Sequence, residues 1–349
     1  MKEISTIGLD LAKSLFQIHG IGSEDHVVVR RQLRRGEVLG FFARLPRCLI
    51  GMEACSGAHY WAREITALGH EVRLIPPAYV KPYVKRGKTD AADAEAICEA
   101  VTRPTMRFVA VKSAEQQASA MVLKTRDLLV RQRSQTINAL RAHLGELGIV
   151  AGTGVAKVAG LIAIVRDHED MRLPPAARFA LEALADQIDR LTEEVQALER
   201  QLVAEVRRDD SMRRLTTIPG VGPITAAAVK ALVPDIAGFT SARHFAAWMG
   251  LTPKPHSSGG KERLGSISKM GNATLRTLLI VGATAVLRHV RRGANGPKWL
   301  IDLLARRPAK VVAVALANKM ARIIFALLTR GGEYRKPEWA TGMEPAAAA

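Results

Sequence analysis

The sequence predicts a protein of the α/β plus α class: a mixed β-sheet covered by helices, then a long helical segment, then a mainly helical C-terminal domain. Three observations support this prediction. Short apolar runs typical of strands lie in the first third of the 349-residue chain. Stretches nearly free of glycine and proline follow, and a basic block that is also apolar lies near the C-terminus.

The first 112 residues alternate between strand and helix patterns. Strands are expected at 4–9, 15–21, 26–33, 48–52 and 71–75, and helices at 37–45, 58–68 and 90–101. Three strands in a row followed by α/β alternation predict a mixed sheet with helices packed on it. We therefore expect a first domain at residues 1–112.

Residues 113–215 are expected to form long helices. Residues 115–147 nearly lack glycine and proline, and a second segment carries apolar residues three and four apart from Leu181 to Leu202. Such a heptad seam predicts a helical hairpin or coiled coil. An oligomerisation arm and an ordinary bundle inside one subunit both fit it. Turns are expected at 152–160 and at Pro174-Pro175.

A third domain is expected at residues 216–335, followed by a disordered tail at 336–349. It opens on the turn Ile218–Pro223, with a helix from Ile224, and this pattern resembles a helix-hairpin-helix element. Gly220 and Gly222 would let the backbone approach a phosphate, and the following helix N-terminus offers free N–H donors. A tight turn between two packed helices is the alternative.

Charge points to a nucleic-acid partner. The net charge is +18, and residues 251–335 alone hold 16 basic and three acidic residues. A concentrated positive field is typical of proteins that bind polyphosphates. A basic surface kept for solubility is the alternative. Aromatic residues make up only 5%, which argues against a protein that binds single strands by base stacking.

Composition also indicates a cytoplasmic protein. The three cysteines form no Cys-x-x-Cys pair, which excludes a disulfide scaffold and a zinc knuckle. The N-terminus lacks the apolar core of a signal peptide. The most apolar stretches, 275–290 and 311–328, each carry charges, so we expect no membrane span.

Four carboxylates are the candidate metal ligands. Asp10 and Glu53 each follow a short apolar strand, and Asp90 and Asp93 lie three apart on one helix face. Four converging carboxylates need cations, and oxygen-only ligands suit Mg²⁺, with Mn²⁺ as a substitute. Asp90 as a simple helix N-cap is the alternative. This order of acids is the pattern of the RNase H-like (RuvC-like) nuclease fold.

The chain resembles the DEDD insertion-sequence transposases, serine-dependent recombinases guided by a bridge RNA. The resemblance covers nearly the whole chain. It rests on Gly8–Lys13, Gly51–Ala54, Lys88–Ile97, Ile218–Pro223, and Gly250–Pro253 through Ser258-Gly259-Gly260 to Gly271-Asn272 and Leu275-Arg276.

The resemblance implies a catalytic serine. By composition alone His256–Gly260 reads as a polar surface loop, because a serine without activation is a poor nucleophile. The family carries its nucleophile in this Ser-Gly context, which assigns Ser258, with Ser257 as the second choice. Asp10, Glu53, Asp90 and Asp93 with Mg²⁺ would then assist DNA cleavage and rejoining through a covalent phosphoserine.

The resemblance also implies partners: double-stranded donor and target DNA, a structured bridge RNA, and self-association as a dimer and tetramer, with the protein on the nucleoid when it acts. The residues expected to contact nucleic acid are Gly220, Gly222, Lys261, Arg263, Lys269, Arg276, Lys319 and Arg322. Two other classes stay open. One is a metal-dependent nuclease of the Holliday-junction type without serine chemistry, and the other is a non-catalytic DNA-binding protein.

Overall fold

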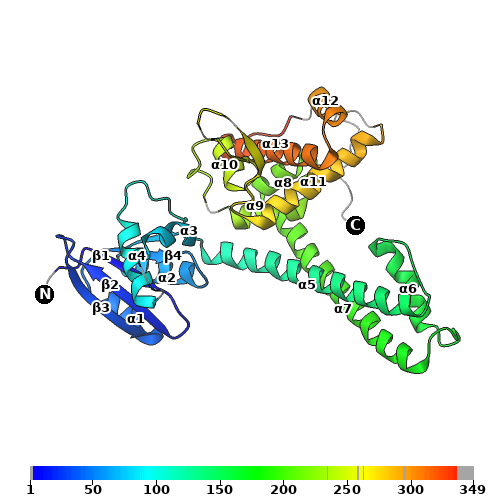
Figure 1. Ribbon diagram of the computed structural model, residues 1–349, viewed down its shortest axis with the longest axis horizontal. Coiled ribbons are helices and arrows are strands. Elements are labelled where there is room, and N and C mark those ends of the chain that lie inside the picture. The colour runs from blue at the N-terminus through cyan, green and yellow to red at the C-terminus, as the bar shows by residue number, and fades with distance from the viewer. Residues whose placement is uncertain are drawn as a thin grey trace. The chain divides into compact units, whose positions relative to one another are not determined.

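The computed structural model describes residues 3–335 apart from Arg86, Lys88, Pro234, Ser258, Glu262, Ala294 and Asn295. The chain divides into two compact units, Met1–Gln117 and Ala118–Ala349 (Figure 1). The predicted tail at 336–349 lies outside the described residues.

Unit 1 is built on a five-stranded mixed sheet of order β3-β2-β1-β4-β5. The strands are β1 (Thr6–Asp10), β2 (Leu15–Ile21), β3 (Val27–Arg34), β4 (Leu49–Glu53) and β5 (Glu71–Ile75). β1, β2 and β3 pair antiparallel, whereas β4 pairs parallel with both β1 and β5. The predicted mixed sheet is therefore confirmed, and it is consistent with a DEDD nuclease-like domain.

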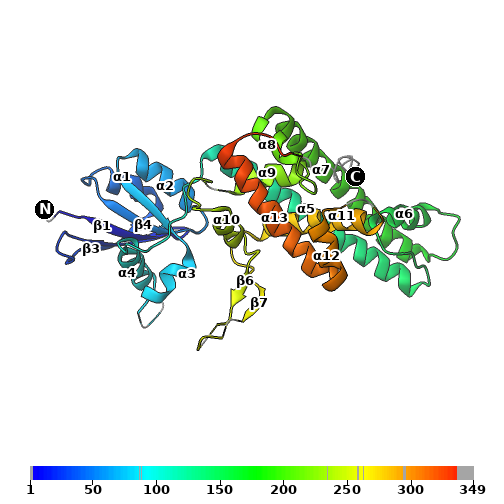
Figure 2. The same cartoon turned by 90° about the horizontal axis from the view of Figure 1, so that it is seen from above.

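Helices cover both faces of this sheet (Figure 2). Side chains alternate along a strand, so Ile7 and Leu9 face α1 (Val38–Phe42) and α2 (Ala58–Ala67), where Phe42 and Trp61 join their core. α3 (Pro77–Val80) and α4 (Asp90–Val101) lie on the opposite face, where Ile75, Val80, Ile97 and Val101 form a second core.

Unit 2 begins with long helices. α5 (Ala114–Glu146), α6 (Val158–Arg166) and α7 (Pro175–Arg208) share a core to which all three contribute. Seam residues Leu181, Ile188, Leu191, Val195 and Leu202 of α7 are buried within the chain. The sequence had indicated only a turn at 152–160, but α6 starts inside that range at Val158 and buries Leu161 and Val165.

The rest of unit 2 is a helical cluster. It contains α8 (Asp210–Thr216), α9 (Pro223–Leu232), α10 (Ala242–Trp248), α11 (Ala273–Arg291), α12 (Lys298–Arg306) and α13 (Ala309–Arg330), around one continuous core. α11 and α13 are long and apolar enough to cross a membrane by length and composition alone. Both contribute buried residues to this core, as the core helices of soluble proteins do.

Candidate active site

Asp10 and Glu53 are neighbours at one edge of the sheet. Each is the last residue of its strand, and the parallel register pairs Leu9 with Met52 immediately before them. Side chains alternate between the two faces of a strand, so Asp10 lies on the same face as Gly8, and Glu53 on the same face as Gly51. Both carboxylates therefore lie on the α4 side of the sheet.

Two glycines let α4 lie against that face. Gly8 and Gly51 are paired across β1 and β4. A Cβ added at Gly8 would overlap the carbonyl oxygen of Ala94 and lie 2.8 Å from Cβ of Cys98, and one at Gly51 would lie 2.8 Å from Cβ of Val101. The helix backbone therefore packs directly on the glycine pair, which brings its first turn beside the strand ends.

The first turn of α4 carries Asp90 and Asp93. The N-cap is Thr89, whose Oγ1 accepts a hydrogen bond from the backbone N–H of Ala92 at 3.2 Å. Asp90 is therefore not the N-cap, and the alternative that this residue only caps the helix is wrong. The positive end of the helix dipole stabilises carboxylates in this position.

The four carboxylates are electrostatically coupled. Burial raises the pKa of Asp10 from 3.8 to about 6, and repulsion from Asp93, Asp90 and Glu53 adds to the rise, against a lowering hydrogen bond from the backbone of Leu11. Cys55, which the sequence did not single out as a site residue, lies in the same field. Burial, then Glu53 and Asp10, raise the pKa of its thiol.

The donor set fits a hard divalent cation, because all four predicted ligands offer oxygen only. Within the described residues, however, no three His, Cys, Asp or Glu side chains form a group that could hold a metal ion. The two observations are compatible, since charge repulsion extends further than a coordination bond.

In the sequence, the predicted serine falls between two short strands of unit 2. β6 (Pro253–Pro255) and β7 (Leu264–Ile267) form an antiparallel ribbon that reaches away from the helices of this unit (Figure 2). Ser258 lies outside the described residues. Its neighbour Ser257 accepts a hydrogen bond at Oγ from the backbone N–H of Arg263, at 3.4 Å. The hydroxyl of Ser257 thus contributes to closing the loop.

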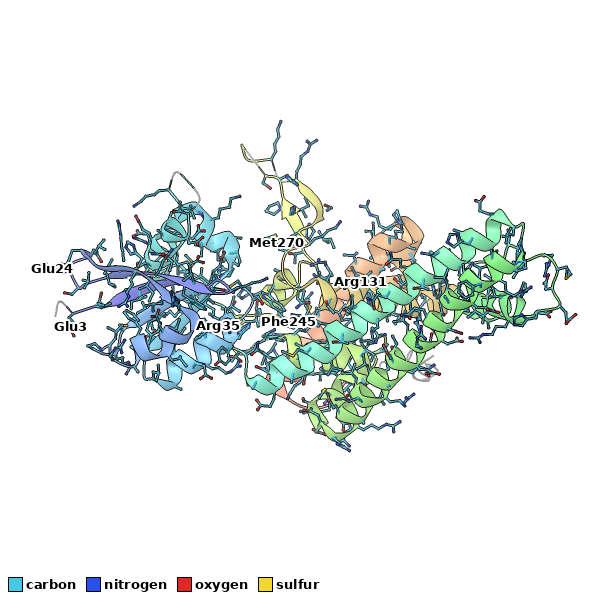
Figure 3. The ribbon with its side chains drawn as sticks, turned by 90° about the horizontal axis from the view of Figure 1, so that it is seen from below. Glu3, Glu24, Arg35, Arg131, Phe245 and Met270 are labelled. Atoms are coloured by element: carbon cyan, nitrogen blue, oxygen red, sulfur yellow. The ribbon has the colours of Figure 1, made fainter. Side chains whose placement is uncertain are left out.

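Residues of the motifs that carry the family resemblance hold the base of the hairpin. Cβ atoms at Gly250 and Gly271 would overlap the carbonyl oxygens of Met270 and Trp248 respectively. Arg276 donates from Nη1 to the carbonyl oxygens of Met249 and Met270, both at 3.0 Å. Met270 lies at this base (Figure 3). Arg276, expected at nucleic acid, thus fastens the start of α11 to the foot of the hairpin.

The turn between α8 and α9 contains both predicted phosphate-contacting glycines. Gly220 has φ +84°, and an added Cβ would lie 2.8 Å from the carbonyl oxygen of Gly282 in α11. Because Gly220 has no side chain, the turn can pack closely against α11. Gly222 is exposed, and nothing lies within 4 Å of an added Cβ. The other predicted contacts are exposed: Lys261, Arg263, Lys269, Lys319 and Arg322.

Sequence reasoning missed the β6–β7 hairpin and expected only a loop around the serine. Its strands are too short and too polar to show an alternating pattern. The sequence did contain one signal for a hairpin. The Gly259-Gly260 pair lies between the two short strand segments, and such pairs mark tight turns.

A mixed sheet with acidic residues at two adjacent strand ends defines a nuclease-like domain, and known families match it. Residues 7–149 match a family model described as "Transposase", and residues 212–296 match the "Transposase IS116/IS110/IS902 family". The chain belongs to the IS110/IS116 family of DEDD transposases, enzymes that cleave and rejoin DNA.

Full-length relatives agree. The chain is 52% identical over 334 residues to a "Probable family 20 transposase" of Pseudomonas aeruginosa, covering 95% of this chain and 99% of the relative. It is 41% identical to the transposase for insertion sequence element IS1111A of Coxiella burnetii, covering 96% and 92%. It is 39% identical to the transposase for element IS1328 of Yersinia enterocolitica, covering 96% and 100%.

Proposed function

We propose that this transposase cuts and rejoins DNA through a covalent phosphoserine at Ser258, assisted by a divalent cation at Asp10, Glu53, Asp90 and Asp93. The observation that carries the proposal is the coupling of four carboxylates at the ends of β1 and β4 and the start of α4. The hairpin adds support, because Lys261 and Arg263 lie exposed beside the serine position.

In the proposed reaction one phosphate ester bond is exchanged for another, and none is hydrolysed. The Ser258 hydroxyl attacks a scissile phosphate, its proton passes to a base, and the new Ser–O–P bond replaces the P–O bond to the leaving strand, whose oxygen takes up a proton. A hydroxyl of another strand end then attacks the phosphoserine, releases Ser258 and restores a phosphodiester. The family's Ser-Gly context assigns the nucleophile to Ser258, with Ser257, which accepts the Arg263 N–H, as the second choice.

Mg²⁺ or Mn²⁺, when bound, would neutralise charge that develops on the phosphate. Asp10, Glu53, Asp90 and Asp93 would hold it. The chain's own contribution is to place these carboxylates: the sheet fixes Asp10 and Glu53, and the close approach of α4 at Gly8 and Gly51 fixes Asp90 and Asp93.

Nucleic-acid contacts are assigned to unit 2. Lys261, Arg263 and Lys269 lie on the hairpin or at its foot, where they are suited to the backbone of DNA. The α8–turn–α9 segment would act as a helix-hairpin-helix, with exposed Gly222 nearest the phosphate. Gly220 and Arg276 are also proposed to contact the nucleic-acid backbone. They would do so alongside the packing contact of Gly220 and the anchoring contacts of Arg276 described above.

The family resemblance supports a wider assembly. A structured bridge RNA would pair with donor and target DNA and supply sequence choice to a protein that has few aromatic residues and many cations. Self-association as a dimer and tetramer would bring several sites to one DNA junction. The protein would act in the cytoplasm, on the nucleoid.

Trapping of the covalent product tests the proposal. Full-length wild type, Ser258→Ala, Ser257→Ala and Asp10→Asn are incubated with RNA, donor and target DNA and Mg²⁺, and protein–DNA adducts are separated under denaturing conditions. We expect adducts with wild type and Ser257→Ala, and none with Ser258→Ala. Full hydrolytic cutting by Ser258→Ala would favour a nuclease without serine chemistry. Unchanged strand exchange by Asp10→Asn would remove the metal site from the mechanism.

A further inference from the structure

A cavity in unit 2 lies outside both proposed catalytic elements. It has a volume of about 780 Å³, which falls in the range of small-ligand pockets. One wall is the face of α13 that carries Lys319 and Arg322, and the others come from Ala242 at the start of α10, Trp299 of α12 and residues 333–335. All these elements belong to the same unit, so the cavity is formed within it.

The cavity walls are positively charged. Lys319, Arg322 and Arg335 line it, against the single acid Glu333. In the part of the chain that the structure describes, none of the three cations takes part in an ion pair. Three cations around one concave surface favour an anionic group such as a phosphate.

Aromatic groups stand beside these cations. Nζ of Lys319 lies 4.5 Å from the centroid of the Trp299 ring, and the indole N–H of Trp299 is shielded from solvent and has no hydrogen-bond partner. A buried donor without a partner is costly, so a group that reached this N–H would be bound favourably. Tyr334 adds a phenol, which is a neutral hydrogen-bond donor at ordinary pH.

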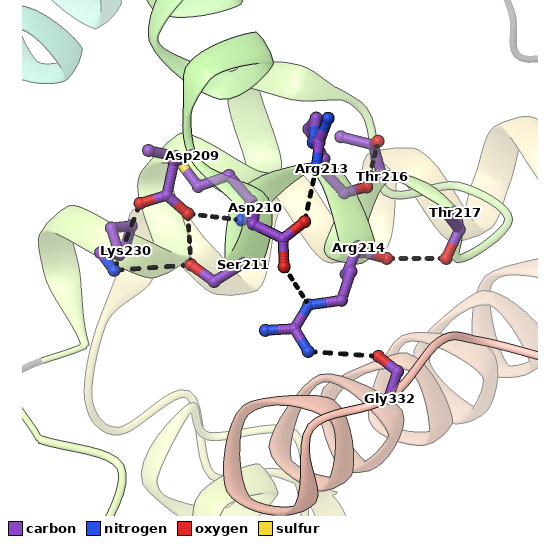
Figure 4. A network of polar contacts seen from close by, with 10 residues as sticks. Asp209, Asp210, Ser211, Arg213, Arg214, Thr216, Thr217, Lys230 and Gly332 are labelled. Atoms are coloured by element: carbon purple, nitrogen blue, oxygen red, sulfur yellow. Dashed lines mark hydrogen bonds and ion pairs between the residues drawn. The ribbon is translucent and has the colours of Figure 1, made fainter.

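Polar contacts hold the cavity rim and connect it to neighbouring elements. In α8, Asp210 binds Nε of Arg214 at 3.3 Å, and Nη1 of Arg214 donates to the carbonyl oxygen of Gly332 at 3.5 Å (Figure 4). This contact fixes the chain immediately before residues 333–335. On α13, Nδ2 of Asn318 donates to the carbonyl oxygen of Leu251 at 3.2 Å, two residues before β6. The cavity thus borders the foot of the serine hairpin.

We propose that this cavity holds one unpaired nucleotide of the nucleic-acid substrate, with its phosphate at Lys319, Arg322 and Arg335 and its base beside Trp299 and Tyr334. A phosphate and a flat base in one ligand match the cations and aromatic rings that line the same cavity. A nucleotide stacked inside a duplex does not present its base to a concave site, so the ligand is an extruded or single-stranded nucleotide. The inference rests on the proposed function, because it takes the nucleic acid to be the transposase's substrate.

Binding to matched duplexes tests this site. Fluorescence anisotropy with full-length protein in EDTA compares a perfect duplex with one that carries a single unpaired nucleotide, in a DNA arm and an RNA arm. Wild type should prefer the unpaired nucleotide by about tenfold in at least one arm, and that arm identifies the strand it comes from. Lys319→Gln/Arg322→Gln should abolish the preference. Trp299→Phe, which keeps a ring but loses the N–H, should reduce it about threefold.

The matched control is Arg306→Gln/Lys310→Gln, which removes two exposed cations near the same helices but outside the cavity lining. It should weaken binding to both duplexes equally and keep the preference. The site is refuted if wild type shows no preference, or if the cavity double variant lowers both affinities by the same factor as the control. Circular dichroism checks that each variant folds.

Ser258→Ala should retain the full preference, since the assay in EDTA requires no cleavage. Loss of the adduct in Ser258→Ala with an intact preference is expected if both proposals hold. An adduct that persists in Ser258→Ala would refute the serine mechanism and leave the cavity test valid. A photoreactive base at the unpaired position should cross-link to residues 298–335, and cross-linking confined to other segments would refute the site.

Discussion

The two units place their chemical groups by different means. In unit 1, Asp10 and Glu53 end two adjacent strands whose other residues are almost all buried, and α4 packs on the paired glycines Gly8 and Gly51. In unit 2, the sequence position of the proposed nucleophile falls between the two strands of a ribbon whose described residues are mostly exposed. In unit 1 the positions of the carboxylates thus depend on core packing. In unit 2 the described contacts that hold the ribbon lie mainly at its foot.

The difference has a physical consequence. A change in the core of unit 1 displaces the carboxylates and costs stability at the same time. A change at the hairpin tip affects chemistry with little effect on stability, since few buried contacts depend on it.

The largest effect is expected from Gly8→Val. Its side chain would overlap the carbonyl oxygen of Ala94, so α4 must move away from β1. We expect unit 1 to lose about 3 kcal/mol of stability, typical of overpacking, and strand exchange to disappear. Urea unfolding followed by circular dichroism measures the loss. Gly36→Ala, where nothing lies within 4 Å of the added Cβ, should stay within about 0.5 kcal/mol of wild type.

The next effect is a pH dependence set by Asp10. Its pKa is about 6 in the folded chain and 3.8 ordinarily, so the folded state binds the proton more tightly. Its contribution is therefore fully present below pH 4 and is lost as pH rises through 6, a fall of about 1–2 kcal/mol after allowance for its exposed part. Asp10→Asn should remove this fall in thermal melts between pH 4 and 7.5.

Glu95 on α4 contributes a pH dependence of the opposite sign. A hydrogen bond from Lys85 lowers the pKa of Glu95, against a raising effect of burial, with further lowering by the charges of Lys85, His19 and Arg30. Its contribution is therefore present above its ordinary pKa and lost as pH falls through the lowered one. Glu95→Gln should flatten the acid side of the stability profile. Identical profiles for Asp10→Asn and Glu95→Gln would contradict the coupling described here.

A smaller effect is expected at the cap of α4. Thr89→Ala removes the acceptor for the Ala92 N–H, which should cost about 1 kcal/mol and slow strand exchange severalfold as the first turn frays. Thr102→Ala at the other end of α4, where the hydroxyl donates to the carbonyl oxygen of Glu99, is the matched control. It should change neither quantity appreciably. An equal loss of activity in both variants would mean that general helix stability, rather than the first turn, controls the reaction.

The smallest effect is expected at the hairpin. Ser257→Ala removes one exposed hydrogen bond to Arg263, so unfolding should change by less than about 0.5 kcal/mol and strand exchange by less than about fivefold. Loss of all product in this variant, with Ser258→Ala active, would exchange the roles of the two serines.

Most of unit 1 is predictable from sequence because its signals are local. Strand β2 and helix α4 have the expected bounds, since apolar runs and an alanine-rich helix define them. The positions of Asp10 and Glu53 follow from the rule that parallel strands end at one edge. Thr89 as the cap was missed, although threonine before an acidic first turn is a familiar helix start.

Unit 2 is less predictable because its key contacts join distant parts of the chain. The seam of α7 indicates a partner helix but does not say that α5 and α6 supply it. From the sequence, Gly220 is interpreted as a phosphate contact with a tight turn as the alternative, and only the structure shows its close approach to Gly282. The cavity joins Ala242, Trp299 and Arg335, which no local pattern connects.

The central claim is that Asp10, Glu53, Asp90 and Asp93 act as one cation site. Isothermal titration calorimetry of Mn²⁺ into full-length wild type, Asp10→Asn and Glu95→Gln at pH 7.5 tests it most directly. We predict that wild type and Glu95→Gln bind Mn²⁺ with the same affinity and that Asp10→Asn binds at least tenfold more weakly. Equal affinities for wild type and Asp10→Asn would contradict the claim.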